Sequence, residues 1–145
     1  HSIMAQTLTD IGEEWLVKSD LSTATVDVGL YNDSTDSLTD SDDVANITTE
    51  PGDGNYARQT DVSISANNIS GDWGVVTDGK VTFDLQNTTP EVDAYFFVVS
   101  FQSETAGDSS AQDHLVVAGS LSQTYDLNSV DTLEVSAGTA GVSVD

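Results

Sequence analysis

The densest group of side chains that could do chemistry lies in one acidic loop. Residues 32–55 read "NDSTDSLTDSDDVANITTEPGDGN", and five aspartates fall in the first half of this loop: Asp33, Asp36, Asp40, Asp42 and Asp43. Carboxylate oxygens at this density are suitable ligands for Ca²⁺. The spacing is not that of an EF-hand loop, because no Gly occupies the sixth position and no Glu the twelfth, counted from any of them. We expect a solvated acidic loop, with a site for Ca²⁺ or another cation as the alternative.

A nucleophilic site would have to use His114. The other histidine, His1, belongs to "HSI" before Met4, which we interpret as the remnant of a tag at residues 1–3. Asp113 precedes His114 and serines are common, but a Ser-His-Asp triad requires convergence in space and no nucleophile-elbow motif is present. No pair of carboxylates stands out for glycoside hydrolysis. We therefore expect no catalytic residues and no enzyme activity.

Arg58 is one of only three basic residues in the chain, so we ask which carboxylate it pairs with. It follows a turn in "TTEPGDGNYARQT", residues 48–60. A planar guanidinium favours a bidentate carboxylate partner, and the nearby candidates are Glu50, Asp53 and Asp61. We favour an ion pair within the chain; the alternative is docking of Arg58 on a neighbouring subunit.

The charge of the chain limits its partners and its habitat. With 25 acidic and three basic residues its net charge is -22, so nucleic acid and anionic membranes should repel it. Self-repulsion destabilises the compact state at low salt and is screened at about molar salt. The near absence of Lys favours a halophile over an ordinary acidic protein, and it favours a haloarchaeal or haloviral origin.

The length and composition suit one domain, which we place at residues 4–145. Cysteine is absent, which excludes disulfides, thiolate metal sites and cysteine nucleophiles. No apolar run approaches the length of a membrane span, and the beginning of the chain lacks the apolar region of a signal peptide.

Most of the chain has the alternating pattern of half-buried strands. We expect about eight strands, with an antiparallel β-sandwich, jelly-roll-like or immunoglobulin-like, as the fold. The acidic loop could contain a short edge strand near Val44 to Thr48, and Trp73 is expected in a Gly-rich turn. The segments with strand patterns are 23–31, 61–66, 80–86, 93–101, 114–121, 131–138 and 141–145.

One helix is expected at residues 7–18, because Leu8, Ile11 and Trp15 share a helical face and Asp10 with Glu13 could form a capping box. The run from Tyr95 to Phe101 should be a central strand, covered on both faces or exposed at an oligomer contact. Our candidates for contact residues are Trp15, Arg58, Tyr95, Phe97 and Phe101.

Several segments carry a resemblance when taken in order. "VGLYN", "GNYARQ", "YFFVVSF", "VVAGSLSQTYDL" and "DTLEVSAGT" follow one another over most of residues 24–140. This series resembles small virion proteins of tailed viruses, which include tail-fibre and minor structural proteins. The long acidic loop departs from their pattern, as does Asp131, which no Gly precedes. The resemblance implies a β-sandwich virion component without catalytic residues.

Together these observations predict a structural protein of a haloarchaeal tailed virus, located in the virion and assembled in the host cytoplasm. We expect a decoration or turret protein on the major capsid protein, or else a tail or fibre component. A trimer or pentamer would match particle symmetry. The alternative is a carbohydrate- or cell-surface-binding module of a halophile, with Trp73 and Tyr56 as aromatic contacts.

Overall fold

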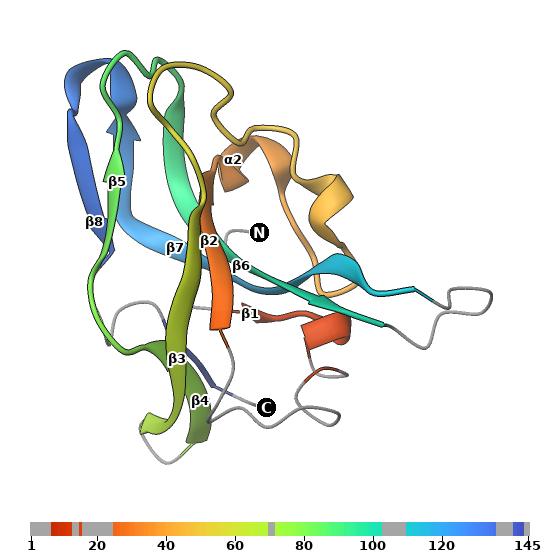
Figure 1. Ribbon diagram of the computed structural model, residues 1–145. Coiled ribbons are helices and arrows are strands. Elements are labelled where there is room, and N and C mark those ends of the chain that lie inside the picture. Colours follow the sequence, from red (N-terminus) through yellow and green to blue (C-terminus); the bar gives the residue numbers. More distant parts are fainter. Residues whose placement is uncertain are drawn as a thin grey trace.

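The computed structural model describes residues 7–12, 15, 25–69, 72–102, 110–135 and 141–143, and it is mainly β (Figure 1). The tag remnant expected at residues 1–3 lies outside these ranges. Strand pairs in the described part are antiparallel, and helices are few and short. No helix in these ranges combines the length and apolar composition needed to span a membrane.

Hydrogen-bonded pairs link most of the described strands into one sheet, in the order β1-β7-β6-β2-β3-β4-β9, and β5 pairs with β8. The end strands β1 and β9 contact each other, so the sheet curves back toward its own first edge. The bounds of the strands are β1 Thr7–Leu8, β2 Thr25–Tyr31, β3 Gln59–Ile69, β4 Asp72–Thr77, β5 Val81–Asp84, β6 Glu91–Phe101, β7 Gln112–Asp126, β8 Thr132–Val135 and β9 Gly141–Ser143.

Strand β6 lies inside the large sheet, between β7 and β2, and its residues 94–98 are buried. Tyr95 and Phe97 face the main hydrophobic core, whereas Phe96 and Val98 face a second apolar cluster. Because side chains of a strand alternate between faces, an almost unbroken apolar run is what a strand between two cores requires. Both faces of the expected run are therefore covered from Tyr95 to Val98, whereas Ser100 is exposed and Phe101 is half-buried.

The β5–β8 pair closes the main core from one side. Its inward residues Val81, Phe83, Leu133 and Val135 are buried and alternate with exposed neighbours. These four side chains belong to the same cluster as Tyr95 and Phe97. The pair thus packs on the same hydrophobic core as the large sheet.

The acidic loop covers the other face of the sheet. It contains helix α2 (Asp33–Asp36) and the 3-10 helix η2 (Val44–Asn46). Leu38, Val44 and Ile47 pack with Phe96 in the second cluster. Figure 1 shows the loop, orange to yellow, on the opposite side of β2 and β6 from β5 and β8. The sequence left open whether this loop is ordered. In the structure its apolar side chains pack on the sheet, and many of its polar side chains face the solvent.

The beginning of the described chain differs from the expected helix at 7–18. Thr7 and Leu8 form β1, paired with β7, and only residues 10–12 and 15 of the expected range are described as helical. The cap is Thr9, whose hydroxyl oxygen accepts a hydrogen bond from the Gly12 amide at 2.9 Å. The same apolar spacing suits a short strand followed by a helix. Residues 13, 14 and 16–18 lie outside the described residues.

Two other local predictions were wrong. Val44 to Thr48 is no edge strand, because Asp43 and Asn46 form a capping box that starts the 3-10 helix η2. Trp73 lies in strand β4 and not in a turn, since β4 pairs along its whole length with β3. The β-pairing of Asp72–Thr77 decided its conformation against the local turn signal of its glycines.

Candidate functional site: the Glu50 clamp

Arg58 is paired with Glu50, one of the three partners expected from the sequence. The guanidinium donates from Nη2 to Oε1 at 2.9 Å and from Nε to Oε2 at 2.9 Å, the bidentate geometry of a strong ion pair. The two side chains are 30% and 22% exposed, so solvent screens the pair only in part. The hydrogen bonds to Glu50 raise the pKa of Arg58, although burial opposes them.

Tyr56 joins the same carboxylate. Its hydroxyl donates to Glu50 Oε2 at 2.6 Å and accepts from the amide of Leu30 in β2 at 3.0 Å. Its ring stacks on Phe83 of β5, with centroids 6.0 Å apart. Burial and the bond to Glu50 raise the pKa of Tyr56, so this hydroxyl stays protonated as a donor. The Tyr56 side chain thereby connects Glu50 of the loop to β2 and to β5.

The ion pair lies over Phe96 and Gly29 of the sheet. The Arg58 guanidinium carbon lies 5.2 Å from the centroid of the Phe96 ring, within the range of a cation–π contact. A Cβ at Gly29 would lie 2.3 Å from this ring and 3.0 Å from Glu50 Oε2. Only a glycine therefore leaves room for both the ring and the carboxylate.

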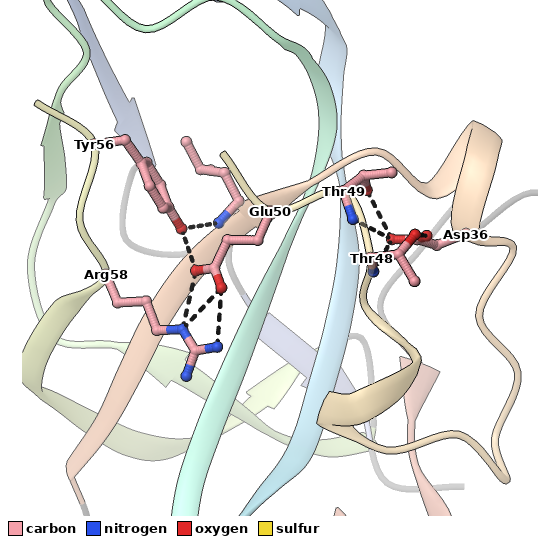
Figure 2. A network of polar contacts seen from close by, with 7 residues as sticks. Asp36, Thr48, Thr49, Glu50, Tyr56 and Arg58 are labelled. Carbon is pink, nitrogen blue, oxygen red and sulfur yellow. Dashed lines mark hydrogen bonds and ion pairs between the residues drawn. The ribbon is translucent and has the colours of Figure 1, made fainter. Parts of the chain in front are cut away.

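Figure 2 shows that the segment of Thr48, Thr49 and Glu50 is held from two sides. On the side away from Arg58, the Asp36 carboxylate accepts bonds from the amides and hydroxyls of both threonines, at 2.5–3.2 Å. Burial would raise the pKa of Asp36, but these hydrogen bonds outweigh it and hold the pKa below its usual value. Asp36 and Glu50 thus fix the return of the acidic loop toward β3. We call the group of residues around the Glu50 carboxylate the Glu50 clamp; its members are Gly29, Glu50, Tyr56, Arg58 and Phe96, and Asp36 lies outside it.

The structure does not gather the five loop aspartates into a calcium site. In the described ranges, no group of three or more His, Asp or Glu side chains could hold a metal ion. Asp33 accepts from the Tyr31 hydroxyl and the Leu38 amide, and Asp42 accepts from the Thr39 amide. These carboxylates order their own loop by accepting backbone and hydroxyl hydrogen bonds, as capping and turn aspartates do.

Asp40 and Asp43 fasten the loop to distant parts of the chain. The Asp40 carbonyl accepts from the Asp10 amide at 2.8 Å. Asp43 accepts from the amide of Leu115 at 2.7 Å, and its other oxygen lies 2.7 Å from His114 Nδ1. The sequence carries no signal for a pairing across 71 residues, so this contact escaped prediction.

His114 is buried, and its ring contacts Phe101 with centroids 4.7 Å apart. Asp43, and not the preceding Asp113, is its carboxylate partner. A carboxylate at Nδ1 favours the tautomer with the proton on that nitrogen. Nε2, where a triad serine would bind, is buried without a hydrogen-bond partner in the described part of the chain.

The remaining interface candidates lie mainly inside the chain. Trp15, Tyr95 and Phe97 are 4%, 1% and 0% exposed and belong to the main core. Phe101, near the end of β6, and Arg58 are half-buried and keep some surface. An interface role for these five residues stays a prediction, and only Phe101 and Arg58 present surface to a partner.

Next to the clamp, the loop encloses an open hollow of about 480 Å³. Most of the residues that line it are polar, and three of them are acidic: Glu50, Asp53 and Glu91. Asp53 is engaged there by Thr89, and Glu50 by the clamp. The hollow is a depression between structural contacts, without convergent free groups of the kind that a ligand site needs.

Comparison with protein-family models, with curated proteins and with solved structures found no match for the chain. The polar groups of the site bind one another across the loop and sheet.

Proposed function

We propose that this chain is a non-enzymatic structural protein of the virion of a halophilic tailed virus. Its place is on the head, as a decoration or turret protein bound to the major capsid protein, or else in the tail or fibre. It acts in a high-salt environment through its surfaces, and the partners are virion proteins and further copies of the chain.

The observation that carries the proposal is the use of the "YARQ" stretch in the Glu50 clamp. This stretch contributes most to the resemblance with small virion proteins, and its Tyr56 and Arg58 both bind Glu50. The motif thus has an architectural role: it holds a long loop against the sheet. A motif of that kind suits a structural protein, because rigid surfaces bind partners at a lower entropic cost.

The fold in the proposal is an antiparallel β-sandwich. The burial of the β5–β8 pair over the core of the large sheet supports two layers. The contact between the end strands β1 and β9 supports a nearly closed sheet, which protects edges from unwanted pairing.

The charge supports the halophilic habitat. Of the three basic residues, Arg58 and Lys80 form ion pairs with glutamates, while 25 acidic residues give the net charge of -22. At 0.2 M salt the Debye length is below about 10 Å, and at 3 M it is below about 3 Å. The free energy of unfolding should therefore rise with salt over this range. A stability independent of salt would count against this part of the proposal.

Virion location can be tested with an antibody raised against the pure chain. Immunogold labelling of virus particles from the source culture should decorate the head or the tail. Mass spectrometry of the same purified particles should detect the chain in stoichiometric amount. Particles that lack the chain would refute the proposal.

The alternative is a carbohydrate- or cell-surface-binding module. It is favoured only by the aromatic residues named for it, of which Tyr56 is half-buried in the clamp. Its hydroxyl is engaged by Glu50 and Leu30, which leaves it poorly placed for a sugar. Retention of the chain on host polysaccharide would favour this module over the virion protein.

A further inference from the structure

A small hollow of about 190 Å³ lies between β7 and β8. Tyr95 from β6, Leu121 and Tyr125 from β7, and Glu134 from β8 are among the residues that line it. Leu121 and Tyr125 are half-buried, since they pack against the main core and keep part of their surface in solvent. A hollow with half-exposed apolar walls is suited to contact with another protein surface.

The β7 segment that borders this hollow is uncharged, in contrast to the composition of the chain. Residues 120–125, "SLSQTY", carry no charge, and three of them, Ser122, Gln123 and Thr124, are exposed. The acidic residue of the lining, Glu134, is paired with Lys80 at 3.4 Å. Asp126 bounds the segment and accepts from the Asn128 amide at 3.0 Å. We call residues 120–125 with this hollow the neutral patch.

The charge argues for the identity of the partner. A basic partner would be attracted to the acidic remainder of the surface and would gain nothing from a neutral patch. Two copies of a chain with a net charge of -22 repel each other on approach. The electrostatic repulsion is smallest where the two contacting surfaces carry no net charge. An association of identical patches repeats every contact about a two-fold axis, so a neutral, half-apolar patch is self-compatible.

We propose that the neutral patch is a self-association surface, occupied by the neutral patch of a second copy of this chain. This inference rests on the proposed function, in which copies of the chain assemble. It names the surface through which they meet. High salt strengthens the contact, because it screens the acidic surfaces that flank the patch.

The test is the molar mass of the full chain by light scattering at 0.2 M and 3 M salt. The wild type should be a dimer at 3 M, because one two-fold contact joins two copies and does not build the trimer or pentamer that particle symmetry would favour. The double variant Ser122→Glu/Gln123→Glu places four added charges in a two-fold contact and should raise the dissociation constant at least about tenfold. The control Thr60→Glu/Ser63→Glu adds the same charge at exposed positions of β3 and should keep the oligomer.

A second measurement does not depend on the folding of the charged variant. The chain contains no cysteine, so Gln123→Cys introduces a single thiol at an exposed position. At 3 M salt a bis-maleimide should link this variant into dimers, whereas Thr60→Cys should stay monomeric under the same conditions.

The outcomes separate the inference from the proposed function. An oligomer that persists in the charged variant, with equal cross-linking of Gln123→Cys and Thr60→Cys, would overturn the proposal that copies associate through the neutral patch. A wild type that is monomeric at both salt concentrations would also overturn it. In either case, immunogold labelling of the particles decides the proposed function independently.

Discussion

Phe96 of β6 pairs with Gly29 of β2, and its ring takes the space that a side chain at Gly29 would fill. The ring in turn lies beneath the Arg58 guanidinium, which binds Glu50. A missing side chain in one strand thus allows an aromatic ring, a cation and a carboxylate to stack over the sheet. This stack closes the acidic loop over the sheet.

Gly29→Ala should destabilise the fold by about 1–3 kcal/mol, because the new methyl group would overlap the Phe96 ring. The measurement is denaturant unfolding at high salt. Gly52→Ala is the matched control, since nothing lies within 4 Å of a Cβ at that position. Equal unfolding midpoints for the two variants would show that Phe96 moves aside without cost.

Glu50→Gln should lower the free energy of unfolding by about 1–2 kcal/mol, because a neutral amide replaces the acceptor shared by Arg58 and Tyr56. Glu134→Gln removes the more exposed pair with Lys80, whose side chains are 66% and 51% exposed. That control should change stability by less than about 0.5 kcal/mol. A Glu50 variant as stable as the control would mean that the clamp adds nothing to the fold.

Asp36→Asn should make the fold less dependent on pH. The folded-state pKa of Asp36 lies below its ordinary value, so the ionised carboxylate stabilises the fold above that value. This stabilisation is lost as the pH falls through the folded-state pKa. The stability difference between wild type and variant should be about 1 kcal/mol near pH 6 and should shrink below about pH 4.

The measurement is denaturant unfolding from pH 2.5 to 7 at constant salt. Asp40→Asn serves as the control in the same loop, because its side chain is exposed and its carbonyl makes the contact to Asp10. A difference for Asp36→Asn that stays constant over this pH range would contradict the role of its ionised form.

Asp43→Ala should leave the Leu115 amide and His114 Nδ1 without their acceptor, at a cost of about 1–3 kcal/mol. Hydrogen exchange should report the loss locally, as faster exchange of the Leu115 amide. Asp42→Ala removes a carboxylate that bonds to Thr39 within the loop and should leave that amide protected. Unchanged protection of Leu115 in the Asp43 variant would refute the fastening of the loop to β7.

Much of the sheet follows from sequence alone. Alternation of apolar and polar residues predicted the strands at 23–31 and 80–86, and the structure has β2 and β5 there. The unbroken run ending at Phe101 predicted a central strand, because only a strand covered on both faces tolerates such a run. The pairing of Arg58 with Glu50 could also be predicted, since the two residues are only eight positions apart in the sequence.

The sequence also determined what kind of surface the chain presents, because a net charge of -22 depends on composition and not on the fold. The tertiary structure decided where the carboxylates act. Four of the five loop aspartates that suggested a cation site, Asp33, Asp36, Asp42 and Asp43, accept hydrogen bonds with their carboxylates, and Asp43 reaches His114 across 71 residues. Alternation and turn signals are local, whereas such contacts depend on which strands become neighbours. That choice is made by burial in a common core, which no short stretch of sequence records.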